Sequence, residues 1–151
     1  MFVLGRLITD NVLVAYETLH TMHFRKKGKK GSLALKLDIS KAYDQVEWQF
    51  LQSVMEKMGF LVAWIERVMS CVTTPSFSIL VNGKAYGVIH PFRGIREGVP
   101  LSPYLLLLCA EGFTALLDQA ESEGSVKGVS ICRGAPKVTK LMFVDDSLLF
   151  C

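Results

Sequence analysis

Two adjacent aspartates, Asp145 and Asp146, interrupt an apolar segment that runs from Leu141 to Phe150. Burying an ionised carboxylate is costly unless the group is paired or binds a cation, and two adjacent carboxylates also repel each other. A third aspartate, Asp38, ends another apolar segment. Because carboxylate oxygens are ligands that Mg²⁺ prefers in proteins, the three acids are candidate metal ligands. A solvated hairpin turn is the alternative for the adjacent pair, since aspartate is common in turns.

The three acids form one cluster if the ends of their strands meet in a single sheet. Such a cluster suits two cations a few ångströms apart, which stabilise the attacking and leaving oxygens of a phosphoryl displacement. The spacing in the sequence does not by itself bring the acids together. A two-metal phosphotransferase or nuclease and a plain turn all stay open at this point.

Periodicity and turn residues predict the elements that would position these acids. Helical spacing predicts helices over 9–24, 46–58, 61–72 and 102–120. The last helix is entered through Ser102-Pro103, a hydroxyl cap followed by a first-turn proline. Alternation predicts strands over 33–38, 76–81, 84–89, 126–132, 138–143 and 147–150, with Asn82-Gly83 and Asp145-Asp146 at hairpin turns. Two hairpins among irregularly spaced helices favour an α+β fold with an antiparallel sheet.

The composition is that of one globular domain with an uneven charge. The chain has 151 residues, of which 50% are hydrophobic and 21% are charged, and its net charge is +3. These values exclude disordered, collagen-like and coiled-coil proteins. A basic tract precedes Asp38 and comprises Arg25, Lys26, Lys27, Lys29 and Lys30. Such a tract is typical of a solvated turn, and contact with nucleic-acid phosphates is the functional alternative.

The four cysteines, Cys71, Cys109, Cys132 and Cys151, show no spacing typical of a zinc site. Their apolar surroundings predict buried free thiols in a reducing, intracellular compartment. The N-terminus carries no pattern of a secretory signal, and the apolar run over 101–117 predicts a buried helix rather than a membrane span. We therefore expect no membrane partner. The nucleus is one option for localisation, which a short basic run does not decide.

Three segments resemble the motifs of reverse transcriptases, and they occur in the same order. The family's first catalytic motif is resembled by residues 37–44 of this chain, Leu-Asp-Ile-Ser-Lys-Ala-Tyr-Asp. The Gln-Gly-x-Pro-x-Ser-Pro motif resembles residues 94–105, Gly-Ile-Arg-Glu-Gly-Val-Pro-Leu-Ser-Pro-Tyr-Leu, and the Phe/Tyr-x-Asp-Asp turn resembles residues 143–146, Phe-Val-Asp-Asp. Flanking residues 5–11 and 108–112 are similar to polymerases of plant non-LTR (LINE-type) retrotransposons. Three ordered motifs are a far more specific signal than one Asp-Asp pair.

The resemblance implies a palm-type antiparallel sheet packed on helices, as in right-hand polymerases. It implies partial fingers and palm entry over 1–32, a palm core over 33–151, and no thumb. The activity it implies is RNA-directed DNA synthesis, in which a deoxynucleotide (dNTP) is joined to the 3′-hydroxyl of a DNA primer on an RNA template. Two Mg²⁺ ions serve this reaction, with Mn²⁺ as an alternative. Asp38 and Asp145 are then the principal metal ligands, and Asp146 is the third catalytic acid.

The resemblance also implies a set of substrate-binding residues. Tyr43 matches an aromatic steric gate that excludes a ribonucleotide 2′-hydroxyl, with a core aromatic as the alternative. Ile39 and Lys41 would lie near the triphosphate, although Lys41 also suits a plain surface position. The element behind the incoming nucleotide is matched by Gly98, Pro100 and Ser102, for which a helix cap is the alternative. The basic tract corresponds to a variable loop, where contact with the template is the less favoured role.

The sequence departs from the family pattern in ways that bear on activity. Glu97 stands where Gln is usual, Val99 where a polar residue is usual, and Val144 where Ala is commoner. The later palm motif, the primer-grip hairpin and the thumb have no counterpart in these residues. We therefore expect a palm core that is weakly active or inactive alone and needs further segments or a partner chain. The alternative is a non-catalytic retrotransposon remnant that binds nucleic acid or protein, for example through an exposed sheet edge.

Overall fold

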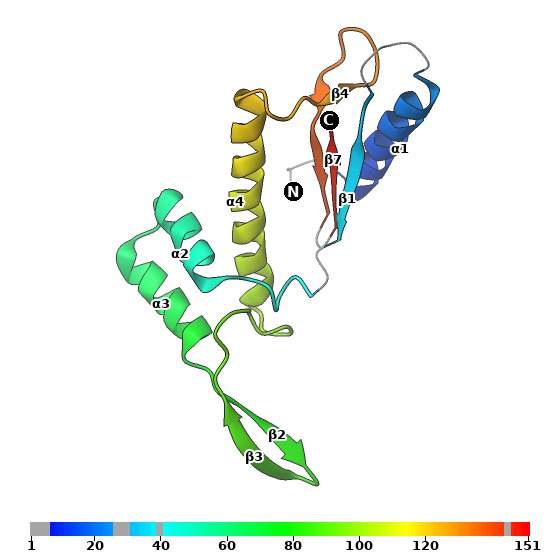
Figure 1. The fold of residues 1–151 in the computed structure, drawn as a ribbon. Helices are drawn as coiled ribbons and strands as arrows, with labels where there is room; N and C mark the ends of the chain where they lie inside the picture. Colours follow the sequence, from blue (N-terminus) through cyan, green and yellow to red (C-terminus); the bar gives the residue numbers. More distant parts are fainter. Residues whose placement is uncertain (1–6, 26–30, 39–40, 144–145) are drawn as a thin grey trace. The chain divides into compact units, whose positions relative to one another are not determined.

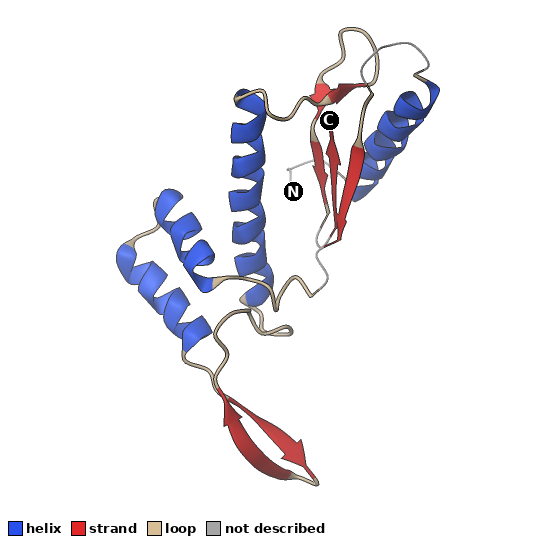
Figure 2. Cartoon of the chain, in the orientation of Figure 1, coloured by secondary structure: helices blue, strands red, loops and turns tan. Residues whose placement is uncertain are grey.

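The computed structural model describes residues 7–25, 31–38, 41–143 and 146–151, and its helices and antiparallel strands form an α+β fold (Figures 1 and 2). The chain divides into two compact units. The first unit comprises Met1–Ser40 with Phe113–Cys151, and the second comprises Lys41–Gly112. Each unit has its own cluster of buried apolar side chains. The predicted α+β class with an antiparallel sheet is therefore confirmed, whereas the palm-type assignment of the sheet and the fingers and palm boundaries stay predictions.

The first unit is built on a three-stranded antiparallel sheet. Its strands are β1 (Ala34–Asp38), β7 (Asp146–Phe150) and β6 (Lys140–Met142), in that order, with β7 in the centre. Helix α1 (Ile8–Phe24) lies alongside this sheet (Figure 1). The core between them contains Ala15 of α1 with Leu141 and Phe150 of the sheet, and Phe150 is fully buried. The Asp10 carboxylate accepts a 2.9 Å hydrogen bond from the Leu7 backbone N–H and so fastens the start of α1.

The second unit contains two helices and a hairpin. Helices α2 (Trp48–Lys57) and α3 (Val62–Thr73) pack through Leu51, Met55 and Ile65. Strands β2 (Phe77–Val81) and β3 (Lys84–Ile89) form the hairpin predicted from Asn82-Gly83. Helix α4 (Ser102–Ser122) gives its first half to this unit and its second half to the other. A Cβ atom at Gly112 would lie 2.4 Å from Val54 Cγ2, so the absence of a side chain there allows α4 to approach α2 closely.

The predicted strands near the C-terminus needed correction. The strand predicted over 126–132 is reduced to β4 (Val129–Ser130), and the one predicted over 138–143 is divided into β5 (Lys137–Val138) and β6. The division has a physical reason, because β5 pairs with β4 whereas β6 pairs with β7. Periodicity along one strand does not reveal such a change of partner. The predicted helices are confirmed to within two residues at each end.

The cysteines are less buried than their apolar neighbours predicted. Cys71, Cys132 and Cys151 are exposed free thiols, and Cys109 is half-buried. The prediction of four buried thiols is therefore wrong for three of them, because these residues lie near the ends of elements, where side chains reach solvent. None of the helices in the described part of the chain is long and apolar enough to span a bilayer.

We expect Cys109 to resist alkylation at about pH 8 while the three exposed cysteines react, because only the thiolate is nucleophilic. Burial raises the pKa of the Cys109 thiol from its ordinary value of 9.0 to about 11. Treatment of the native chain with iodoacetamide, followed by peptide mass spectrometry, measures the four labelling rates.

The raised pKa of Cys109 also makes the stability of the fold depend on pH. Because the folded state disfavours the Cys109 thiolate, the contribution of this thiol to stability is complete below pH 9.0 and is lost as the pH rises toward about 11. Labelling in urea is the control, since all four thiols should then react alike. Labelling of Cys109 as fast as Cys71 in the native chain would contradict the prediction.

Candidate active site

Asp38 and Asp146 face each other across two neighbouring strands. Asp38 is the last residue of β1, Asp146 is the first residue of β7, and the antiparallel register pairs the two directly. Residues that are paired in this way project from the same face of a sheet, with Cβ atoms about 5 Å apart. The strand order and register thus bring together two of the three acids that the sequence singled out. The turn prediction is corrected in one respect, because Asp146 belongs to the strand.

A lysine lies beside this acid pair. Lys36 precedes Asp38 by two residues on β1, so it shares the same face of the sheet. Its Nζ atom lies 3.1 Å from Asp146 Oδ1, in a diagonal pair across the two strands. The side chains of Lys36 and Asp146 are 59% and 38% exposed, so solvent screens this ion pair.

The third acid lies outside the described residues. The Phe143 N–H donates a 2.7 Å hydrogen bond to the Asp146 carbonyl oxygen, and the two residues between them in the chain are Val144 and Asp145. In the part of the chain that is described, no three or more His, Cys, Asp or Glu side chains are grouped to hold a metal ion. The two facing carboxylates are the donor type that a hard divalent cation takes. The complete three-acid cluster stays a prediction.

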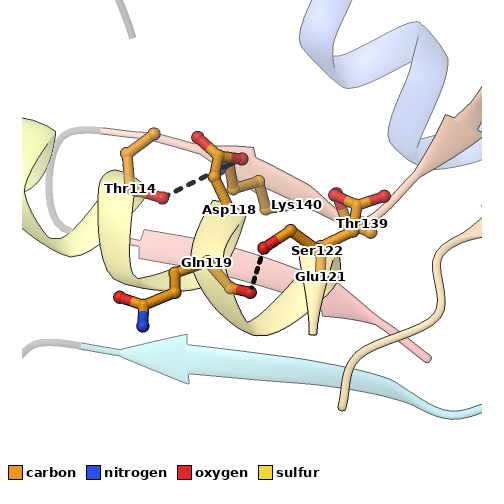
Figure 3. Close-up of polar contacts among 7 residues, drawn as sticks. All are labelled: Thr114, Asp118, Gln119, Glu121, Ser122, Thr139 and Lys140. Carbon is orange, nitrogen blue, oxygen red and sulfur yellow. Dashed lines mark hydrogen bonds and ion pairs between the residues drawn. The ribbon is translucent and has the colours of Figure 1, made fainter. Parts of the chain in front are cut away.

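The strand that leads to the acids is fastened to α4 by a largely buried lysine (Figure 3). The side chain of Lys140 on β6 is 16% exposed. Its ammonium donates a 3.0 Å hydrogen bond to the Thr114 carbonyl oxygen and is also paired with the Asp118 carboxylate. Next to it, the Thr139 hydroxyl donates a 2.9 Å hydrogen bond to Glu121. This cluster was not predicted from the sequence, although a lysine inside an apolar strand was a usable signal.

In the second unit, backbone hydrogen bonds join the segment after Asp38 to the loop that precedes α4. The Gly94 N–H donates to the Val46 carbonyl at 2.7 Å, and the Ile95 N–H donates to the Tyr43 carbonyl at 2.8 Å. The Trp48 indole N–H donates to the Gly94 carbonyl at 2.7 Å. Gly94 has a φ of +87°, and a Cβ atom on it would lie 3.1 Å from the Asp44 backbone. Glycine is therefore required where the two segments meet.

The start of α4 is tied to the same loop. Ser102 is buried, and its hydroxyl donates a 2.6 Å hydrogen bond to the Arg96 carbonyl oxygen. The Ser102 backbone N–H donates to the Val99 carbonyl at 3.0 Å. The serine thus closes the loop over 96–102, a role that the prediction of a helix cap did not contain.

The sequence matches a known protein family. The family described as reverse transcriptase (RNA-dependent DNA polymerase) matches residues 3–151. The chain belongs to the reverse transcriptase family.

Relatives from transposable elements support this assignment. A retrovirus-related Pol polyprotein from the type-1 retrotransposable element R2 of Popillia japonica is 30% identical over 125 residues, which are 83% of this chain and 20% of the polyprotein. The uncharacterized 149 kDa protein of transposon TX1 from Xenopus laevis is 30% identical over 145 residues, which are 96% of this chain and 10% of that protein. The predicted resemblance to reverse transcriptases of non-LTR retrotransposons is therefore confirmed.

A plant protein also matches part of the chain. An uncharacterized mitochondrial protein of Arabidopsis thaliana is 38% identical over 68 residues, which are 45% of this chain and 56% of that protein. This chain thus spans about half of the plant relative and a fifth or less of the two transposon proteins.

The other predicted reverse transcriptase residues are distributed as follows. Tyr43 is half-buried and packs against the core of the second unit, as its alternative role as a core aromatic also requires. Lys41 is exposed and has a φ of +55°, a left-handed conformation that costs a non-glycine residue about 1 kcal/mol or more. Gly98 and Pro100 are exposed in the loop before α4. Arg25 is exposed after α1, whereas the following residues lie outside the described ones: Lys26, Lys27, Lys29, Lys30 and Ile39.

A pocket that the sequence did not predict adjoins this loop. It has a volume of about 260 Å³, and its lining includes Phe77, Arg96 and Leu105. The Arg96 guanidinium lies 5.8 Å from the centroid of the Phe77 ring, a cation–π distance. The lining residues come from segments far apart in the sequence, so no local pattern could have indicated the pocket.

Lys140→Met is expected to lower the free energy of unfolding by about 1–3 kcal/mol, because it removes hydrogen bonds to a carbonyl and a carboxylate from a largely buried position. Urea denaturation followed by circular dichroism measures the loss. Lys137→Met on β5 is the matched control, since Lys137 is exposed, and it should change stability by less than about 0.5 kcal/mol. Equal effects of the two substitutions would show that Lys140 does not fasten β6 to α4.

Proposed function

We propose that this chain carries the catalytic palm core of an RNA-directed DNA polymerase, with Asp38, Asp145 and Asp146 as its metal-binding acids. The observation that carries the proposal is the direct pairing of Asp38 with Asp146 at the ends of two antiparallel strands. This pairing occurs in a chain that belongs to the reverse transcriptase family. The reaction is the attack of a primer 3′-hydroxyl on the α-phosphate of a deoxynucleotide, with pyrophosphate as the leaving group.

The facing carboxylates suit a divalent cation, because they offer hard oxygen ligands and little desolvation is needed at an exposed strand end. Two Mg²⁺ ions, when bound, lower the charge of the triphosphate and favour ionisation of the primer hydroxyl. The protein's own part is to hold Asp38 and Asp146 in register on one face of the sheet, so that the ligands are positioned before the substrates arrive.

We assign recognition of the deoxynucleotide to the second unit. Tyr43 would exclude a ribonucleotide 2′-hydroxyl. Its packing against the core supports this role, because the ring of a steric gate must keep its position when a ribonucleotide approaches. Lys41 would lie near the triphosphate, together with Ile39, which is two residues earlier and belongs to the first unit. The left-handed backbone at Lys41 supports its role, since strained conformations cluster at functional sites. The loop with Gly98, Pro100 and Ser102 would back the incoming nucleotide and the templating base.

One observation favours a second candidate, a non-catalytic module that binds nucleic acid. The hairpin of β2 and β3 exposes apolar side chains, including Leu80, Tyr86 and Val88. No acidic residue occurs from Val68 to Arg96, whereas Lys84, Arg93 and Arg96 do. Exposed aromatic and basic groups together are typical of surfaces that bind single-stranded nucleic acid. This candidate predicts salt-dependent RNA binding that survives Asp145→Asn and falls when the basic tract is neutralised.

Primer extension tests the catalytic roles of the acids. With a DNA primer annealed to an RNA template, deoxynucleotides and Mg²⁺, we expect weak extension or none by the 151-residue chain, because primer holding belongs to other segments of such polymerases. Any extension should disappear in Asp38→Asn and Asp145→Asn, measured on denaturing gels. Extension that survives either substitution would contradict the catalytic roles of these acids.

Metal binding tests the acids without requiring turnover. Asp38→Asn or Asp146→Asn should weaken Mn²⁺ binding to the chain by about tenfold or more, because each removes a charged oxygen ligand from the site. Electron paramagnetic resonance of free Mn²⁺ measures the binding. Glu66→Gln on α3 is the control, since it removes the same charge from an exposed position in the other unit. Unchanged affinity in both aspartate variants would refute the proposed site.

A further inference from the structure

The carboxylates of Asp38 and Asp146 repel each other when no metal is bound. Like charges directly opposite on neighbouring strands destabilise the pairing. Asp38 and Asp146 occupy opposite positions of this kind. The Lys36 ammonium, 3.1 Å from Asp146 Oδ1 and on the same face as Asp38, places a positive charge beside the two carboxylates.

We propose that Lys36 is a built-in counter-cation of this site, which offsets part of the negative charge of Asp38 and Asp146 in the metal-free chain and competes with the divalent cation for Asp146. This inference rests on the proposed function, because it takes Asp38 and Asp146 as metal ligands. The competition follows from position, since a cation that binds the facing carboxylates is held beside the Lys36 ammonium, which lies 3.1 Å from Asp146 Oδ1. Lys36 is thus a positioning residue and not a catalytic one.

The exposure of the pair allows the exchange. The Lys36 side chain is 59% exposed, so its ammonium can move into water on a flexible four-carbon stem without leaving a buried charge behind. Ion pairs with this exposure are weak and are screened by salt. Lys36 can therefore protect the register of β1 and β7 and still yield to a divalent cation.

The size of the competition can be stated as an affinity ratio. A single positive charge a few ångströms from a divalent cation weakens binding by roughly three- to tenfold in a solvent-exposed site at moderate salt. Lys36→Met keeps most of the side-chain length and removes the charge. It should therefore tighten Mn²⁺ binding to the 151-residue chain by that factor, and the gain should shrink as salt is raised.

Two control variants distinguish an effect of the Lys36 charge from an effect on the structure of the site. Lys36→Arg keeps the charge and should leave the affinity for Mn²⁺ within about twofold of the original chain. Lys84→Met changes the net charge equally, on the exposed hairpin of the other unit, and should have no effect on affinity. A purely structural lysine would give the opposite sign, because its loss disorders the acids and weakens binding.

The outcomes decide between this inference and the function on which it rests. Mn²⁺ binding that is lost in Asp38→Asn and tightened in Lys36→Met supports both. Binding that is lost in Asp38→Asn but unchanged or weakened in a folded Lys36→Met chain, as judged by circular dichroism, overturns the competition alone. Binding that is absent, or indifferent to both aspartates, overturns the metal site and the competition together.

Discussion

The antiparallel pairing of β1 with β7 is the constraint on which the candidate active site depends. Because the strands run in opposite directions, the last residue of β1 and the first residue of β7 lie at the same end of the sheet. Asp38 is therefore paired with Asp146 there. A slip of one residue would turn one carboxylate to the opposite face. The same slip would remove Phe150 from the core that it forms with Ala15 and Leu141. The apolar end of β7 therefore fixes the position of the charges at its other end.

Two lysines of this sheet, each paired with an aspartate, show how burial decides what an ion pair does. Lys140 is 16% exposed and also donates to a backbone carbonyl, so breaking its contacts would leave a desolvated ammonium. It fastens β6 to α4. Lys36 is 59% exposed, so water can replace its carboxylate partner at little cost. The largely buried contacts of Lys140 lie on β6, the strand that leads to the acids. The exposed contact of Lys36 lies at the acids themselves. In the proposed metal site, the acids therefore exchange Lys36 for a cation while the contacts that hold the sheet stay in place.

The sequence predicted the elements well where periodicity or turn chemistry is local. The hairpin at Asn82-Gly83 and the helices followed from such signals. The division of residues 137–142 between two partners did not, because the pattern within a strand says nothing about which strand lies beside it. The acids were found because carboxylates in apolar segments are costly and therefore informative. The contact between Lys36 and Asp146 was missed, because a diagonal pair depends on a register that only the folded sheet defines.

Two departures from the family motif, Glu97 and Val99, lie in a loop whose hydrogen bonds do not use their side chains. The loop before α4 is held by backbone groups of Gly94, Ile95 and Arg96, together with the buried Ser102 hydroxyl. Glu97 and Val99 are exposed within that loop, and neither side chain contributes to those hydrogen bonds. An altered side chain there can change what the loop offers to a nucleotide without changing the loop. Glu97 and Val99 therefore leave in place the hydrogen bonds that hold the loop.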